Sequence, residues 1–341
     1  MGLVVYLVEV KEIKEVILNK KFFLFILLFF NIYLSLYAIK ISEIEGTKIL
    51  SNYDEIKDIE VERVFEKKTG TSVFNRVNGL AYPKNENKMF SGLLVSRSKG
   101  NTIVGLYQYK NGKGNGIGND YYENGNLKSK SKMIDDETQG EVLFYYPSGR
   151  LERIGYYKKY NGIEIEEKDT EYYENGKIKS TLKAKDGLNA EMIGYYENGN
   201  KSYVMNVIQD YSVKGKINYL KNGESIAYEK NGNLWGILNF KNNSAYGLPQ
   251  KLFKNGKLKY EFISAAEVGE KLETMTYFKE YFDKSDKLKL DCDEVSSGEW
   301  HCKEYKKDGT LKNEFTSPTY KPKKDNSFWI NAFLGIWNIL F

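Results

Sequence analysis

The sequence predicts an all-β protein in which antiparallel β-hairpin repeats stack into one elongated, curved sheet. Three observations support this prediction. Tyrosine, which is typical of strands, occurs 28 times among 341 residues. A short phrase with an aromatic residue and a glycine returns along most of the chain. The glycine mostly follows Asn, Asp or Ser, and these residue types favour tight turns.

The repeated phrase reads aromatic, two residues, Asn or Asp or Ser, Gly, any residue, Leu or Ile, and then Lys or Arg. It is clearest in the sequence "YYENGNLKSK". Its glycines are Gly125, Gly149, Gly176, Gly199, Gly232, Gly256 and Gly309. A degenerate copy, "FDKSDKLK", places Asp286 in the glycine position. The repetition predicts a repeat architecture, in which each copy is one supersecondary unit.

Each copy is predicted to be one β-hairpin. Asn-Gly between aromatic and aliphatic residues favours a type I′ turn, because that turn needs positive φ at both central positions. A lone hairpin is marginal in water, so the copies must extend one another's sheet. Stacking then aligns the second tyrosine of each phrase in one aromatic row. The members of that row are Tyr122, Tyr146, Tyr173 and Tyr196.

The phrases carry a family resemblance. The segments "GLAYPKNENKMFSG", "GIGNDYYENGNLKSK" and "YYENGKIKS" resemble the MORN-repeat variant of bacterial proteins called YwqK-type antitoxin components. The resemblance covers residues from about Arg76 to Lys312. It implies a scaffold for protein partners or membrane lipid, or an antitoxin that masks a toxin. The array is predicted to occupy residues 76–320, after an N-terminal linker and cap at residues 39–75.

The N-terminus is predicted to export or anchor the chain. Residues 22–38 carry no charge and follow Lys20 and Lys21. A basic flank before an apolar core matches a secretory signal peptide, whereas an uncleaved membrane-anchoring helix with its lysines inside is the alternative. Residues 1–38 are therefore predicted to be a signal peptide or an N-terminal membrane anchor.

The C-terminus, residues 321–341, is predicted to be a basic linker and a short apolar helix. In residues 328–341, Asn331, Gly335 and Asn338 form one polar stripe at helical spacing. Such a helix is too short to span a bilayer. Three interpretations stay open: a cap on the end of the repeat sheet, a helix in a membrane interface, and a terminal outer-membrane strand.

The sequence contains no recognisable catalytic motif. His301 is the only histidine, which disfavours a histidine zinc site or a Ser-His-Asp triad. The "GKGNGIG" run lacks the spacing of a phosphate-binding loop, and we interpret it as turn chemistry. Acidic pairs such as Asp135–Asp136 and Glu166–Glu167 are interpreted as solvated strand edges. We predict no enzyme activity, cofactor or metal, and, because Lys and acidic residues interleave, no nucleic-acid partner.

The two cysteines predict a disulfide. Cys292 and Cys302 flank "DEVSSGEWH", in which Ser297 and Gly298 favour a turn that would bring the cysteines together across a hairpin. Such a bridge is typical of exported proteins. The alternative is a pair of reduced, buried thiols.

These observations predict a non-enzymatic, exported or membrane-anchored repeat scaffold of the bacterial cell envelope. Its tyrosine-rich sheet would bind an unknown protein or glycan partner. An antitoxin-like protein is the second interpretation. The third is a protein that associates with membrane lipid through residues 22–38 and 328–341, for which only Lys321, Lys323 and Lys324 supply a basic cluster.

Overall fold

The computed structural model describes residues 38–213, 216–245, 247, 249–265, 274–296 and 299–317. Within these residues the protein is all-β, as predicted, apart from three short helical turns. The predicted terminal helices, in residues 22–38 and 328–341, lie outside the described residues except for Ala38. The chain divides into two compact units, Met1–Gly149 and Arg150–Phe341.

The first unit combines the beginning of the repeats with a set of short, non-repeated elements. Its helical turns are η1 (Ile41–Glu43), η2 (Thr47–Ile49) and α2 (Tyr53–Ile56). Its strands are β1 (Ile39–Lys40), β2 (Glu60–Val61), β3 (Val64–Lys68), β4 (Phe74–Val77), β5 (Leu80–Pro83), β6 (Gly92–Arg97), β7 (Ile103–Lys110), β8 (Lys113–Tyr121), β9 (Leu127–Ile134), β10 (Glu137–Thr138) and β11 (Glu141–Tyr145).

Strands β6 to β9 form an antiparallel series, and β3 pairs with β6 in parallel. The parallel pair departs from the predicted all-antiparallel arrangement. It is possible because β4 and β5 form a separate hairpin in the long connection from β3 to β6. Residue 76, where the array was predicted to start, lies in β4.

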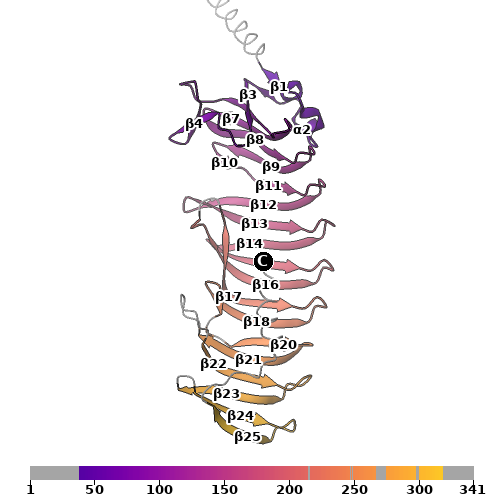
Figure 1. The fold of residues 1–341 in the computed structure, drawn as a ribbon, viewed down its shortest axis with the longest axis vertical. Coiled ribbons are helices and arrows are strands. Elements are labelled where there is room, and N and C mark those ends of the chain that lie inside the picture. Colours follow the sequence, from indigo (N-terminus) through magenta and orange to yellow (C-terminus); the bar gives the residue numbers. More distant parts are fainter. Residues whose placement is uncertain are drawn as a thin grey trace, which may run out of the picture. The chain divides into compact units, whose positions relative to one another are not determined.

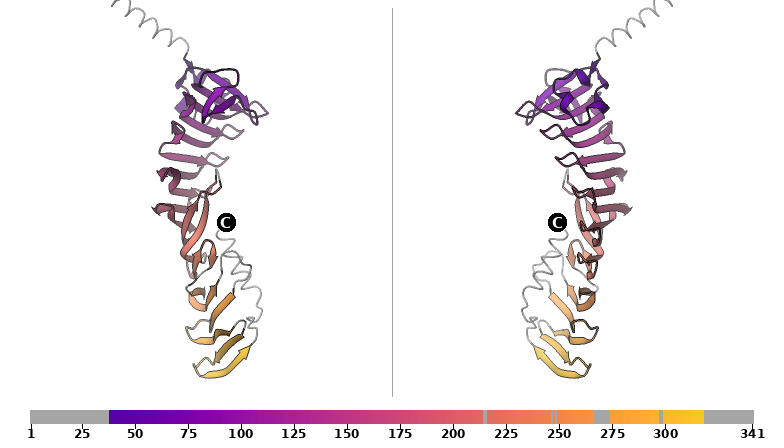
Figure 2. Two further views of the ribbon diagram at one scale, coloured as in Figure 1. Left: turned by 90° about the vertical axis from the view of Figure 1, so that its left-hand side faces the viewer. Right: turned by 90° about the vertical axis from the view of Figure 1, so that its right-hand side faces the viewer.

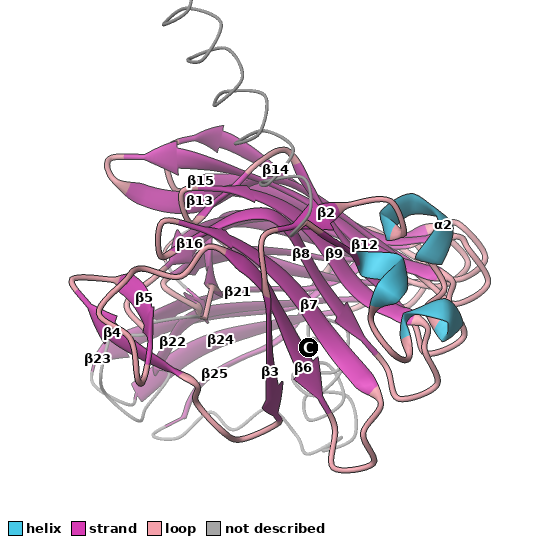
Figure 3. Ribbon diagram, turned by 90° about the horizontal axis from the view of Figure 1, so that it is seen from above, coloured by secondary structure: helices cyan, strands magenta, loops and turns pink. Residues whose placement is uncertain are grey.

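Both faces of β6 are covered in the first unit. Leu93 and Val95 pack with Ile41 and Ile56 from the helical segment. Leu94, on the opposite face, packs in a cluster with Phe90. Figure 3 shows the helical turns and the β4–β5 hairpin on opposite sides of β6, β7 and β8. Every residue of β6 is buried, as expected of a strand packed on both faces.

The second unit is one antiparallel series of hairpins in chain order (Figures 1 and 2). Its strands are β12 (Leu151–Tyr160), β13 (Ile163–Tyr172), β14 (Ile178–Asp186), β15 (Asn189–Tyr195), β16 (Lys201–Asp210), β17 (Asn218–Tyr228), β18 (Leu234–Lys241), β19 (Ser244–Ala245), β20 (Gln250–Lys254), β21 (Lys257–Ala265), β22 (Thr274–Tyr281), β23 (Leu288–Ser296), β24 (Glu299–Tyr305) and β25 (Leu311–Ser317). Most of its buried apolar residues form three small clusters.

Six of the seven turns that contain a repeat glycine are not type I′, which corrects the prediction for those six. In the turn at Gly176, the Gly176 amide donates to the Tyr173 carbonyl at 2.8 Å, and the Tyr173 amide donates to the Lys177 carbonyl at 2.8 Å. Gly176 has φ of 84°, whereas Asn175 is not among the residues with positive φ. This is a type I turn closed by a glycine bulge. Equivalent glycines with positive φ are Gly125, Gly149, Gly199, Gly232 and Gly309.

The asparagine of these turns has another role, which explains its recurrence. The Asn175 side-chain oxygen accepts a hydrogen bond from the Lys177 amide at 3.0 Å. Asn198 does the same for the Asn200 amide at 3.1 Å. A short polar side chain that bonds the main chain two residues on is a known turn device. Asn is therefore selected here as an acceptor.

Type I′ turns do occur at other hairpins. Asn161 and Gly162 have φ of 50° and 80°, and Asn255 and Gly256 have φ of 53° and 74°. Gly256 is thus the one repeat glycine that matches the predicted turn type. In the degenerate copy the residue with positive φ is Lys284, at 60°, so Asp286 does not take over the glycine's conformation.

Candidate binding surface

The repeated phrase builds a hydrogen-bonded ladder along one end of the strands. The Tyr173 hydroxyl donates to the Tyr195 carbonyl at 2.6 Å, and the Tyr196 hydroxyl donates to the Tyr228 carbonyl at 2.8 Å. In the first unit, the Tyr122 hydroxyl donates to the Tyr145 carbonyl at 2.8 Å. Each of these three tyrosines therefore ties its own turn to the turn of the following phrase.

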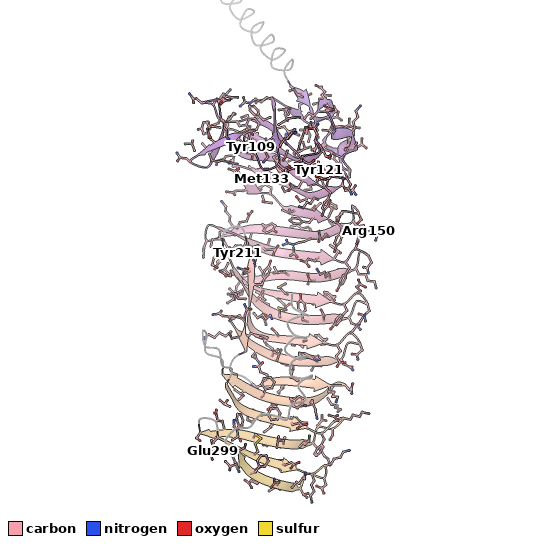
Figure 4. The ribbon with its side chains drawn as sticks, in the orientation of Figure 1. Tyr109, Tyr121, Met133, Arg150, Tyr211 and Glu299 are labelled. Atoms are coloured by element: carbon pink, nitrogen blue, oxygen red, sulfur yellow. A yellow bond between two sulfur atoms is a disulfide. The ribbon has the colours of Figure 1, made fainter. Side chains whose placement is uncertain are left out.

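The side chain of the residue after the glycine forms a second hydrogen bond between neighbouring turns. The Arg150 side chain donates to the Glu174 carbonyl at 2.8 Å, and Lys177 donates to the Glu197 carbonyl at 2.7 Å. Asn200 donates to the Lys230 carbonyl at 3.0 Å. Arg150 lies at the turn end of the strands in Figure 4. Arg, Lys and Asn all have a side-chain N–H, which accounts for the choice of residues at this position.

Tyr173 and Tyr196, two of the tyrosines predicted to form an aromatic row, do not pair with each other through their rings. Tyr146 lies at its predicted turn, where the Gly149 amide donates to its carbonyl at 2.8 Å. Within the described residues, Tyr173 and Tyr196 make no ring–ring contact with each other, since the turns that carry them are separated by two intervening strands. Hydroxyl-to-carbonyl hydrogen bonds from Tyr122, Tyr173 and Tyr196 link neighbouring turns instead.

The first aromatic residue of the phrase pairs with the aliphatic residue that follows the turn. Tyr172 lies opposite Ile178, Tyr228 opposite Leu234, and Tyr305 opposite Leu311. Aromatic–aliphatic cross-strand pairs stabilise a sheet by about 0.2–1 kcal/mol each. The two aromatic positions therefore serve different purposes: one pairs across its own hairpin, and the other bonds the next hairpin.

One continuous cross-strand row, here called the long row, follows the sheet of the second unit. Its members are Ile154, Thr170, Thr181, Ile193, Val204, Ile226, Ile237, Lys251, Glu261, Lys279, Asp291, Lys303 and Glu314. Because side chains alternate along a strand, these residues share one face of the sheet, which we call the row face.

The long row changes character along its length. From Ile193 to Ile237 it is aliphatic and half-buried. From Lys251 onward, charges of opposite sign alternate, with ion pairs of 3.9 Å for Lys251–Glu261 and 3.6 Å for Lys279–Asp291. Surface ion pairs contribute little stability individually, but opposite charges across strands fix the register.

The opposite face carries a buried ionic cluster that the sequence analysis missed. Arg153 forms ion pairs with both Glu166 and Asp169. The Tyr219 hydroxyl also donates to Glu166. Glu166 is fully buried, which corrects the interpretation of the Glu166–Glu167 pair as a solvated edge. No local pattern signals this burial, because Glu166 lies in an alternating polar strand, and its cover comes from β16 and β17.

The end of β16 and the start of the connection to β17 supply part of that cover. The Gln209 side-chain amide both accepts from the Glu166 amide at 3.0 Å and donates to the Glu166 carbonyl at 2.8 Å. Gln209 thereby bonds the main chain of β13 across the two intervening strands. The Tyr211 hydroxyl oxygen also accepts a hydrogen bond from the Glu166 amide at 3.0 Å. Figure 4 shows Tyr211 at the end of the strands away from Arg150.

Burial changes the acidity of this cluster. Burial, reinforced by the negative charge of Glu166 and opposed by Arg153, raises the pKa of Asp169 to about 7. Burial and Glu166 also raise the pKa of the Tyr219 hydroxyl. The Arg153 guanidinium loses solvation, but the two carboxylates raise its pKa further above the usual range. The cluster fastens the β16–β17 connection to β13 and leaves Glu166 inaccessible to a substrate.

The predicted disulfide is confirmed. Cys292 on β23 lies directly opposite Cys302 on β24, and the Cα atoms are 4.1 Å apart. Both cysteines are fully buried against Phe278, Leu290 and Trp300. The predicted turn at Ser297 and Gly298 lies outside the described residues. His301 neighbours this site and contacts Glu314 at 2.8 Å.

Among the described residues, no group of three or more His, Cys, Asp and Glu side chains is placed to hold a metal ion. The same residues contain no helix that is long and apolar enough to cross a membrane.

Comparison with known proteins confirms the resemblance to the MORN repeat variant. Residues 115–135, 138–159, 170–186 and 221–242 match that family. No curated protein matches the chain.

Solved structures add remote likenesses. A porin-like protein from Bacteroides uniformis is similar at 9% identity and a TM-score of 0.17, over 55% of this chain and 88% of its own. A TcdB2-TccC3-Cdc42 complex is similar at 11% identity and a TM-score of 0.14, over 71% of this chain and 16% of the other. The Tc holotoxin pore of Photorhabdus luminescens is similar at 11% identity and a TM-score of 0.15, again over 71% and 16%. None of these scores bears on function.

Proposed function

We propose that the chain is a non-enzymatic scaffold of the bacterial cell envelope, exported or membrane-anchored, whose second unit presents a tyrosine-rich sheet to a protein or glycan partner. The observation that carries the proposal is the row face. Many consecutive strands present aligned side chains there, and the ladder of turns holds those strands in one register. A regular, extended face of this kind suits an extended partner better than a small substrate.

The disulfide and the N-terminus support the location. Disulfides persist in oxidising compartments and are rare in the cytosol, so Cys292–Cys302 favours export. The apolar residues 22–38 were predicted from the sequence to be a signal peptide or an anchor.

Fractionation of the native cell tests this proposal. We expect the chain in the envelope fraction, with Cys292 and Cys302 resistant to alkylation until a reductant is added. Mass spectrometry of the N-terminus then distinguishes a cleaved signal peptide from a retained anchor. An unprocessed chain in the cytosol with both thiols free would contradict the proposal.

That contrary result would favour the antitoxin interpretation, which the resemblance to YwqK-type proteins suggests. An antitoxin masks its toxin in the cytosol, so a stoichiometric complex with one small partner would be expected there. A chain that is in the envelope but released by high salt alone would favour association with membrane lipid instead.

A further inference from the structure

We propose that the row face of the second unit binds an anionic polysaccharide at a patch on β12, β13 and β14. The patch consists of Tyr156, Lys168, Lys183, Thr170 and Thr181. This inference rests on the proposed binding role and names the chemical class of the partner.

The two lysines of the patch lie directly opposite each other. Lys168 on β13 pairs with Lys183 on β14, and both side chains are exposed. Like charges directly opposite on neighbouring strands destabilise a sheet. Within the described residues, neither lysine has an ion pair. An anion bound between the two ammonium groups would remove this repulsion, so the arrangement favours an anionic ligand.

The rest of the row face shows that this arrangement is exceptional. Along the long row, Lys251 faces Glu261, and Lys279 faces Asp291. Lys254 and Lys257 also lie opposite each other, but each has its own acidic partner, at 3.1 Å for Lys254–Asp283 and 3.3 Å for Lys257–Asp286. Among the described pairs of the second unit, the two patch lysines alone oppose like charge without a partner.

The nearest acids are engaged elsewhere. Glu191 lies opposite Lys183 on the next strand, but its carboxylate pairs with Lys185 at 3.2 Å. Glu167 pairs with Lys158 at 3.1 Å. The positive potential over Lys168 and Lys183 is therefore reduced by these acids but not cancelled by contact.

The neighbouring side chains suit a sugar. Thr170 and Thr181 lie opposite each other one step along the same two strands, and within the described residues their hydroxyls make no hydrogen bond. Tyr156 lies opposite Lys168 and is 39% exposed, so an aromatic side chain borders the two lysines at the surface. Hydroxyl groups, an aromatic side chain and two ammonium groups match a polymer of sugars that carry carboxylates.

The same features disfavour two other classes of partner. Lysine is depleted at the centre of protein–protein interfaces, where aromatic side chains and arginine dominate. Binding to a membrane surface combines basic residues with apolar residues that insert, whereas the lysines here are flanked by threonines.

Direct binding to the full-length chain tests the inference. The probes are polygalacturonate, neutral dextran of similar length, polyglutamate, and vesicles of phosphatidylglycerol. We expect polygalacturonate to bind, and dextran not to bind. Binding should weaken as ionic strength rises, because the lysines are exposed to solvent.

Matched variants locate the site. Lys168→Gln with Lys183→Gln should lower the affinity for polygalacturonate at least tenfold without lowering the melting temperature, because it removes a repulsion. Lys168→Arg with Lys183→Arg should retain binding. The control is Lys306→Gln with Lys307→Gln, which changes the net charge equally at an exposed turn and should leave the affinity within twofold.

Several outcomes would overturn the inference. They are no binding of polygalacturonate, an equal loss in the Lys306 and Lys307 control, equal binding of polyglutamate, and preference for the vesicles. None of them would contradict the proposed scaffold if fractionation still finds the chain in the envelope with its disulfide intact. If the chain is cytosolic, the scaffold proposal fails, whatever the polysaccharide result.

Discussion

The two units stabilise the same kind of hairpin in different ways. In the first unit, strand β6 is buried on both faces, and large apolar side chains such as Phe90 and Leu106 are fully buried. In the second unit, cross-strand rows, a ladder of turn hydrogen bonds and one disulfide support the sheet, with small apolar clusters between them. Packing of buried apolar side chains contributes most to the stability of the first unit. Repeated cross-strand and turn contacts contribute most to the stability of the second.

The difference shows what a repeat needs. A hairpin repeat buries little apolar area by itself, so an array depends on contacts between neighbours. Non-repeated elements, such as residues 41–56, add the three-dimensional core that the repeats lack. Truncation of one buried side chain should therefore lower the free energy of unfolding more in the first unit than in the second.

The largest effect is expected for Phe90→Ala. Phe90 is fully buried, with ring centroids 5.2 Å from Phe65 and 4.7 Å from Phe74. Its truncation should cost about 3–5 kcal/mol of unfolding free energy. Ile226→Ala, at a half-buried position of the long row, should cost clearly less. Hydrogen exchange measures both, and an equal cost would contradict the contrast between the units.

Loss of the disulfide should have the next largest effect. Replacing Cys292 and Cys302 together by alanine removes the link across β23 and β24. For so short a loop, the chain-entropy model gives a cost of about 2–3 kcal/mol. Denaturant unfolding with and without a reductant measures it. A reductant that destabilises the wild type but leaves the double variant unchanged isolates the bond from other effects.

The repeat glycines offer a matched comparison between the units. Gly125 and Gly176 both have φ of 84°, so alanine at either position should cost about 1 kcal/mol in backbone strain. A Cβ on Gly125 would also lie 2.6 Å from the Ile49 carbonyl oxygen, whereas a Cβ on Gly176 meets nothing within 4 Å. Gly125→Ala should therefore cost at least about 2 kcal/mol. Similar melting temperatures for the two variants would refute this difference.

The smallest effect is a pH dependence of the second unit. Burial raises the pKa of Asp169 to about 7 in the folded state, above its value in the unfolded chain. The folded state thus holds a proton that the unfolded state has released. The resulting stability is fully present below about pH 4 and is lost as the pH rises through about 7.

The variant Asp169→Asn removes this titration and keeps an oxygen for Arg153. The unfolding free energy of the wild type relative to the variant should fall by on the order of 1 kcal/mol between pH 5 and pH 8. A constant difference over that range would mean that Asp169 stays ionised throughout.

The repeat architecture was determined by the sequence itself, because turn chemistry is local. The aromatic phrase and its glycine mark each hairpin without knowledge of any distant contact, and seven repeat glycines have positive φ. The cysteine spacing likewise predicted the disulfide, since both residues belong to one hairpin. The identity of the turn was wrong at most phrases, because Asn suits a type I′ turn and a type I turn with a glycine bulge equally well.

Only the tertiary structure decided which residues share a face. Each β-bulge inserts one extra residue, as at Ser202 on β16 opposite Gly194 and Tyr195, and a shift of one residue moves every later side chain to the other face. The long row, the opposed Lys168 and Lys183, and the burial of Glu166 all depend on the sum of such shifts over many strands. Local sequence sets each bulge, but pairing across the whole sheet determines which face each side chain occupies.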